Sequence, residues 1–556
     1  MKKVFSKIKS MGFMGLFPWL WLVFAYFWEM GYQIIHGREV LDADLAAEMV
    51  LSNLLNKEHS MLSKEWIYST ELRVFESQWF YRLGLLIFPN NWHAARVFAT
   101  MIMLAVLAAL VIIAARMLGL KKAAPWAAAI LMCPFGRFWL VYSTYGTYYL
   151  IYTGFSLLTI IAIAGICKKE KLIAAGNIGF FLLGIFAGLA SGLNGIKQTM
   201  FFFAPLMIAT FILLLTAVFE RGEQIKKEKD ILPVCKKELK IFGVSAFFTI
   251  FNLAGFFINS HILKNIYSFT DFGQTNWTGE PQTRLYDVIV DFVSLFGYES
   301  GGKVLSVSGL ISGIGLVFGF IIPASVIILF RKYKELKLSE RLIILIVAST
   351  LAFCSLIFCY IDVYQSFHWL YHVYYWLPLM PFLMFTLLMA VQMLGKALLP
   401  KLKNLLCVLA VIGAALVTLV SWNTTKKEVE DPLFGYKGYV EAADFLMDNG
   451  LTQGYAMFWS SAVLRELSDG QIETWTITNP DIYIVHEWLQ EKSHFDTDPE
   501  GKVFYLVDAD PALLGETYAE SAYIQSGNGQ EIYSNGTIHI YEFESAESFK
   551  NSGLTY

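Results

Sequence analysis

Val97–Ala115, VFATMIMLAVLAALVIIAA, is a run of 19 residues without a charged side chain. A helix of about 20 mostly apolar residues is long enough to cross the hydrocarbon core of a bilayer. The whole chain has a matching composition, because 56% of its 556 residues are hydrophobic and only 16% are charged. Soluble domains carry about 25% charged residues. The sequence therefore excludes an ordinary soluble enzyme and predicts a polytopic α-helical membrane protein.

Ten further apolar windows extend this pattern and bring the prediction to eleven membrane-spanning helices. The window 123–142 is interrupted only by Arg137, and the window 138–167 overlaps its end. The remaining windows are 10–28, 172–196, 198–219, 241–263, 304–330, 342–361, 363–395 and 404–425.

Basic residues are concentrated in alternate connections between these windows. Of the 43 lysines and arginines, 25 lie in the segments 1–10, 116–122, 168–171, 220–240, 331–341 and 396–403. Short loops rich in lysine and arginine stay on the cytoplasmic side of a membrane. We therefore predict a multi-pass protein of the cell membrane with an uncleaved first helix, a cytoplasmic N-terminus and an extracytoplasmic C-terminus.

This orientation places three long segments outside the membrane, namely 36–92, 261–303 and 422–556. The last of them contains 23 acidic and 7 basic residues. Helix-like and strand-like runs alternate there, with a hairpin turn at Asn535-Gly536, which predicts a small α/β domain. We expect a transmembrane catalytic domain over 1–421 and this extracytoplasmic domain over 422–556. The near-neutral charge balance indicates no nucleic-acid partner.

The first external segment brings carboxylates close to a membrane surface. A helix that begins at Asp44 would place Asp44 and Glu48 on one face, one turn apart, with Asp42 just before them. Such carboxylates can remove a proton from a hydroxyl. Asp42 and Asp44 can also hold a divalent cation such as Mg or Mn against a phosphate. The alternative is that Asp44 only caps its helix.

A second amphipathic helix is predicted further along the same segment. Leu72, Phe75 and Trp79 recur at helical spacing, and the pattern continues through Leu86. Such a helix is expected to lie on the membrane surface. Glu71 precedes it, and that carboxylate either binds substrate or favours the helix start electrostatically.

The stretch Asp42-Ala-Asp-Leu-Ala-Ala-Glu48, placed after the first span, resembles the first external loop of the GT-C superfamily of integral-membrane glycosyltransferases. That group includes protein O-mannosyltransferases and aminoarabinose transferases. Gly188–Lys197 and Tyr374–Pro381 resemble two further motifs of the superfamily. The resemblance implies a bacterial enzyme that transfers a sugar, with inversion, on the outer face of the membrane. Its partners would be a polyprenyl-phosphate sugar donor, membrane lipid, and a cell-envelope glycan, lipid or protein acceptor.

The resemblance also implies roles for particular residues. Asp44 is the expected general base and Asp42 and Glu48 orient it, although the choice between the two aspartates stays open. Cations at headgroup depth would bind the donor phosphate and stabilise the leaving group; the candidates are Lys197, Arg96 and Arg137. For the two arginines the alternative is snorkelling to the interface. Further substrate-binding candidates are Glu71, His368, His372 and Tyr374.

Two other classes of function remain as alternatives. A transporter or flippase for a lipid-linked glycan would need polar residues across the bilayer midplane, which the charge-free windows disfavour. A catalytically inactive glycan-binding relative would have lost the acidic residues of the first loop, and here they are present.

Overall fold

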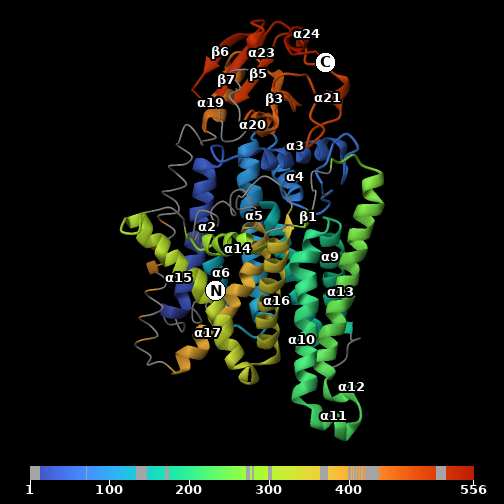
Figure 1. Cartoon of the computed structure of the whole chain (residues 1–556), viewed down its shortest axis with the longest axis vertical. Helices are drawn as coiled ribbons and strands as arrows, with labels where there is room; N and C mark the ends of the chain where they lie inside the picture. Colours follow the sequence, from blue (N-terminus) through green and yellow to red (C-terminus); the bar gives the residue numbers. More distant parts are fainter. Residues whose placement is uncertain are drawn as a thin grey trace, which may run out of the picture. The chain divides into compact units, whose positions relative to one another are not determined.

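The structure is a computed structural model of the 556-residue chain, shown in Figure 1. It describes residues 13–70, 72–132, 147–169, 175–270, 276–277, 281–298, 303–362, 373–397, 437–508, 521–536 and 538–555, with scattered positions between 402 and 419. Most described residues are helical, and a small sheet lies near the C-terminus. The chain is a multi-pass helical membrane protein with a C-terminal α/β domain.

Seven helical segments in the described residues are long and apolar enough to cross a membrane. Each coincides with a predicted window, so these seven predictions are confirmed as apolar helices. The segments are Trp92–Met117, Tyr149–Cys167, Thr199–Glu220, Lys236–Asn265, Val307–Arg331, Leu338–Tyr360 and Tyr375–Leu394.

The other four predicted spans are not among these seven helices. The first lies in helix α2 (Phe13–His36), which is helical but not among the seven. The window 172–196 contains the shorter apolar helix α9 (Ile178–Gly192). The first half of the window 123–142 is described and contains α6 (Ala124–Leu131), whereas its second half and most of the window 404–425 lie outside the described residues. The total of eleven spans therefore stays a prediction.

Contacts divide the chain into two compact units. The first comprises 1–28, 103–262 and 273–422, and the second comprises 29–102, 263–272 and 423–556. The first unit contains α6, α9, the two-residue strands β1 (Asn276–Trp277) and β2 (Ile361–Asp362), α8 (Thr147–Cys167), α10 (Ala204–Glu220), α11 (Gly222–Glu228), α12 (Ile231–Val234), α13 (Lys236–His261), α14 (Pro281–Ser294), α15 (Val307–Arg331), α16 (Leu338–Tyr360), η5 (Val373–Leu379) and α17 (Met380–Ala397). The division falls inside α2 and inside α5 (Trp92–Met117).

Glycines allow α9 and α13 to approach each other closely (Figure 1). A Cβ atom on Gly192 would lie 2.0 Å from the carbonyl oxygen of Asn252, and one on Gly255 would lie 2.3 Å from that of Leu189. Within this contact the Asn252 amide donates to the Ser191 hydroxyl at 3.0 Å. Small residues and a buried amide bond are typical of packed membrane helices. The glycines of the Gly188–Lys197 stretch thus hold the end of α9 in place.

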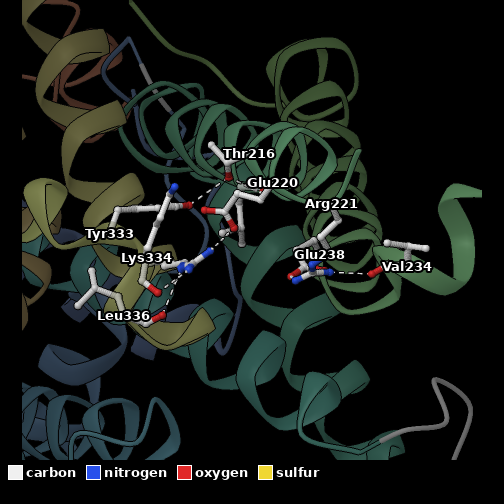
Figure 2. Close-up of polar contacts among 10 residues, drawn as sticks. Thr216, Glu220, Arg221, Val234, Glu238, Tyr333, Lys334 and Leu336 are labelled. Atoms are coloured by element: carbon white, nitrogen blue, oxygen red, sulfur yellow. Dashed lines mark hydrogen bonds and ion pairs between the residues drawn. The ribbon is translucent and has the colours of Figure 1, made fainter. Parts of the chain in front are cut away.

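At one end of the first unit, polar bonds join α10 to two neighbouring segments (Figure 2). Arg221 binds both carboxylate oxygens of Glu238, the shorter bond being 2.9 Å. Arg341 binds Glu220 at 2.9 Å, and the Thr216 and Tyr333 hydroxyls lie 3.1 Å apart. The segments 220–240 and 331–341, predicted to share the cytoplasmic side, therefore lie at the same end of this unit.

The second unit joins the first and third of the segments that the sequence places outside the membrane with the start, 263–272, of the second. Tyr68 in the first segment donates its N–H to Ser268 in the second, at 2.9 Å. Its neighbour Ile67 exchanges backbone bonds of 3.0 and 2.9 Å with Gln490 and Leu489 in the third. These bonds require the three segments to share one side of the membrane, as predicted.

The first segment contains two helices, α3 (Ala43–Glu58) and α4 (Gln78–Ile87). Helix α4 begins later than the pattern predicted, because 72–77 is not helical. Leu72 is fully buried instead, so its apolar character reflects packing and not helical periodicity. Leu86, in contrast, is 70% exposed, as a helix lying on a membrane surface requires.

The C-terminal segment forms a five-stranded sheet with the order β4-β3-β5-β7-β6. The strands are β3 (Gln453–Met457), β4 (Glu473–Ile477), β5 (Val503–Asp508), β6 (Gln530–Ser534) and β7 (Ile538–Phe543), and the helices are α19 (Lys437–Asp448), α20 (Phe458–Leu467), α21 (Ser493–Asp496), α23 (Ala522–Gln525) and α24 (Ala546–Lys550). β3 pairs in parallel with β4 and β5, and β7 is antiparallel to β5 and β6. The predicted turn at Asn535-Gly536 connects β6 to β7, and Gly536 has a φ of +99°.

Aromatic side chains form the core of this sheet domain. Tyr455, Tyr505, Tyr523 and Phe549 are fully buried and in mutual contact, with the Tyr455 and Phe549 rings stacked 4.1 Å apart. Between β3 and β4 the chain passes through α20, which packs against α3 of the first segment. The sheet domain therefore reaches the helix that carries the predicted catalytic carboxylates.

Candidate functional site

Asp42 is the N-cap of α3. Its backbone is extended, with φ −103° and ψ 167°, and its Oδ1 accepts a 2.9 Å hydrogen bond from the Leu45 N–H. The helix therefore begins at Ala43, and the expectation that Asp44 opens or caps it is wrong. A carboxylate just before a helix accepts a hydrogen bond from one of the free N–H groups of the first turn. Asp42 already provides this carboxylate. Asp44 lies in the first turn, where the helix dipole favours negative charge.

Burial and a like charge act together on the aspartate pair. Both side chains are half-buried. Burial first, and then the negative charge of Asp44, raise the pKa of Asp42 to about 7. The Leu45 N–H bond and the positive charge of Arg96 oppose that rise. A carboxylate whose pKa lies near neutrality is well placed to exchange a proton with a hydroxyl.

Glu48 follows one turn after Asp44 in the same helix and is 7% exposed. Its Oε1 accepts a 3.1 Å bond from Nη1 of Arg73, whereas Oε2 has no hydrogen-bond partner in the described residues. Burial raises the pKa of Glu48, and the charge of Arg73 opposes this. The sequence analysis did not select Arg73. No pattern in the sequence around Arg73 indicated this role.

Arg96 is buried, with 3% of its surface exposed. Its Nε and Nη2 bind the two oxygens of Glu466 at 2.5 and 2.6 Å, and Nη2 also donates to the Leu45 carbonyl at 2.8 Å. Nη1 donates to the Tyr81 hydroxyl at 3.0 Å. A donor phosphate would therefore have to displace Glu466 from this arginine. The predicted phosphate contact of Arg96 stays a prediction, and simple snorkelling does not describe its position.

A cavity of about 220 Å³ lies in the second unit. Its walls include Arg38, Leu41, Asn91, His93, Glu466 and Asp469. Cationic, anionic and amide groups therefore surround one space together with a leucine. Most of these lining groups are polar or charged, and Glu466 among them is already bound to Arg96.

Lys197 belongs to the first unit and lies at the start of the helical stretch that continues into the π-helical segment η2 (Thr199–Phe203). It is half-buried, and its Nζ is 5.9 Å from the ring centres of both Tyr149 and Tyr375. Tyr375, next to the predicted Tyr374, was missed, although it belongs to the same quoted motif. Single π-helical turns inside helices occur often at functional sites.

Four predicted site residues lie outside the described residues: Arg137, Glu71, His368 and His372. The backbone of Tyr374 belongs to η5, but its side chain is not described. Asp42, Asp44, Glu48 and Arg96 belong to the second unit and Lys197 to the first.

A metal site requires more ligands than the aspartate pair. The described residues contain no group of three or more histidine, cysteine, aspartate or glutamate side chains arranged to hold a metal ion. Asp42 is already the helix cap, and Glu48 is paired with Arg73. The divalent cation therefore stays a prediction, for which Asp42 and Asp44 would supply the carboxylate oxygens.

Comparisons with known proteins gave structural similarities only. No model of a known protein family matches the sequence, and no curated protein matches it. The crystal structure of ArnT from Cupriavidus metallidurans bound to undecaprenyl phosphate is 10% identical, with a TM-score of 0.48. The apo state of that protein is 11% identical, with a TM-score of 0.47. Each comparison covers 96% of this chain and 99% of ArnT.

Proposed function

We propose that this protein is a membrane glycosyltransferase that moves a sugar from a polyprenyl-phosphate donor to an acceptor hydroxyl. The observation that carries the proposal is the half-buried pair of Asp42 and Asp44 at the start of α3, in which burial and like charge raise the pKa of Asp42 to about 7. The loop sequence that resembles the GT-C superfamily supplies the same two aspartates. The nature of the donor and the inversion at the sugar come from that resemblance.

The chemistry needs one base and one phosphate-binding cation. Asp44 removes the proton of the acceptor hydroxyl, and the oxygen attacks the anomeric carbon of the sugar. The bond from that carbon to the phosphate oxygen breaks, and polyprenyl phosphate leaves with the bonding electron pair. Lys197 binds this phosphate and stabilises its growing charge. Asp42 caps the helix that carries Asp44, and Glu48 completes the acidic face of α3.

The proposed orientation puts the N-terminus in the cytoplasm and the sheet domain outside. Two contacts support it. Backbone bonds join the three predicted external segments, and polar bonds join two of the basic segments predicted to be cytoplasmic (Figure 2).

The test is release of polyprenyl phosphate by the purified protein in nanodiscs. A panel of undecaprenyl-phosphate sugars, including the mannose and aminoarabinose forms, would be incubated with a cell-envelope extract as acceptor. Release by wild type but not by D44N would support the proposal. Absence of release from folded protein would contradict it, and a lipid-flipping assay would then test the transporter alternative.

The rate of transfer should fall as the pH drops below about 7. The pKa of Asp42 is raised to about 7, so below that pH the aspartate pair gains a proton and loses its basic form. Asp42→Asn removes the carboxyl that titrates near pH 7, so the acidic limb of the pH–rate profile should move to lower pH. Asparagine caps helices as well as aspartate does, so α3 should remain intact. A pH–rate profile with an unmoved acidic limb in Asp42→Asn would contradict this coupling.

Lys197→Ala should raise KM for the donor at least about tenfold, because a charge-assisted bond to phosphate contributes about 1.5–3 kcal/mol. The fold should persist, since Lys197 is only half-buried and alanine is well tolerated in the helical stretch that it starts. The measurement is donor titration at saturating acceptor. Lys303→Ala, at an exposed lysine, is the control and should behave as wild type. An unchanged KM in Lys197→Ala would remove Lys197 from the proposed site.

A further inference from the structure

Glu466 is a side chain of the sheet domain that reaches the first external segment. It ends α20 together with Leu467, and both of its carboxylate oxygens bind Arg96, at 2.5 and 2.6 Å. The two side chains are each 4% exposed. A two-oxygen bond between arginine and a carboxylate has a defined geometry. When the pair is buried, removing either partner leaves an uncompensated charge. The pair therefore holds the orientation of the guanidinium.

Arg96 also connects Glu466 to α3. Its Nη2 also donates to the carbonyl oxygen of Leu45, at 2.8 Å. Leu45 is the same residue whose N–H is bound by the Asp42 carboxylate at 2.9 Å. One residue of the first helical turn is thus held by Arg96 on its carbonyl and by Asp42 on its amide. Any movement of Arg96 should therefore move the turn that carries Asp42 and Asp44.

Further contacts hold the end of α20 against the first segment, and α20 lies beside α3 in Figure 1. Arg38 donates to the Leu467 carbonyl at 3.3 Å, and Asp469 accepts a 2.6 Å bond from the Trp92 N–H. These contacts place Glu466 against Arg96 without the need for any other ligand. The sheet domain is therefore part of the structure around the carboxylates.

We propose that Glu466 is a positioning residue for the aspartate pair, because it holds Arg96, which in turn holds the first turn of α3. The catalytic meaning of this role rests on the proposed glycosyltransferase function. The mechanical link from Glu466 to Leu45 does not, so it can be tested separately.

Substituting Glu466 has a second, electrostatic consequence. Asp42 is influenced by the Asp44 carboxylate, by the Arg96 guanidinium and by the N–H groups of Leu45 and Asp44. In Glu466→Gln the positive charge of Arg96 is no longer balanced. That charge lowers the pKa of Asp42, so the acidic limb of the pH–rate profile should move to lower pH. A general loss of stability would not produce this movement.

The experiment compares Glu466→Gln with wild type in nanodiscs. Hydrogen exchange of the backbone would be followed in peptides covering 41–50, and transfer would be assayed with the panel of undecaprenyl-phosphate sugars. We expect faster exchange confined to this region, and a fall in kcat of about tenfold, as for loss of a group that orients active-site residues. Glu466→Asp, which keeps the charge, should give a smaller effect. Glu542→Gln is the matched control, because Glu542 lies on β7 and forms an ion pair with Lys502 near the surface.

The outcomes separate the two proposals. Unchanged exchange in 41–50, or faster exchange spread over the whole chain, would overturn the positioning role of Glu466. A fall in kcat without any movement of the acidic limb would also count against it. If wild type releases no polyprenyl phosphate, the glycosyltransferase proposal fails, and the exchange measurement still decides whether Glu466 holds the start of α3.

Discussion

Replacing Asp44 by asparagine is expected to lower transfer at least about 100-fold, because general-base catalysis contributes roughly 10²–10⁴-fold. The amide has nearly the same shape as the carboxylate but cannot accept the acceptor proton. Asp42 caps α3, so the helix does not depend on Asp44 for its start. The fold should therefore persist. Release of polyprenyl phosphate, measured at saturating donor, reports the change in kcat.

Asp448→Asn is the matched control for this substitution. Asp448 is exposed at the end of α19, so the same chemical change there should leave the rate unaltered. Asp42→Asn distinguishes the two aspartates, since it keeps the cap but removes the neighbouring charge. If Asp42→Asn abolished release of polyprenyl phosphate and Asp44→Asn retained it, Asp42 and not Asp44 would be the base.

Replacing Arg96 by leucine should destabilise the folded protein by about 3–5 kcal/mol. The substitution leaves Glu466 buried without its charged partner and removes the bonds to Leu45 and Tyr81. Taking a lone carboxylate out of water is costly, and the apolar replacement offers it no hydrogen bond. Thermal unfolding of the purified protein in detergent micelles should show a clearly lower midpoint.

A double substitution tests the stated cause of this loss. In Arg96→Leu with Glu466→Leu no buried charge remains, so much of the stability should return, because buried ion pairs can often be replaced by apolar residues at little cost. Lys332→Leu, at an exposed pair with Glu335, is the control and should change the midpoint little. An unfolding midpoint of Arg96→Leu equal to that of wild type would contradict a structural role for the pair.

Local patterns in the sequence were sufficient for much of the fold. The run 97–115 became the membrane-length helix α5, because a charge-free stretch of that length has few other stable environments. The Asn535-Gly536 turn joined two strands, since glycine there adopts a positive φ. The one-turn spacing of Asp44 and Glu48 follows from helical periodicity alone.

Local patterns were misleading where packing competed with periodicity. Leu72 was placed in a helix by its spacing, yet the chain buries it in a non-helical stretch before α4. The helix was expected to begin at Asp44, yet it begins at Ala43, and Asp42 holds the Leu45 N–H. Two acceptors two residues apart are equally able to cap a helix, and the path of the chain entering the helix decides between them.

The sequence by itself determined that this chain is a helical membrane protein with a sheet domain and an acidic first loop, because length, hydrophobicity and periodicity act locally. The tertiary structure alone decided the partners of the charged groups. Arg96 and Glu466 are 370 residues apart in the chain, and Glu48 and Arg73 are 25 apart. Charges are paired by whichever buried surfaces meet, and burial adds to the charge of the nearby Asp44 to bring the pKa of Asp42 close to neutrality.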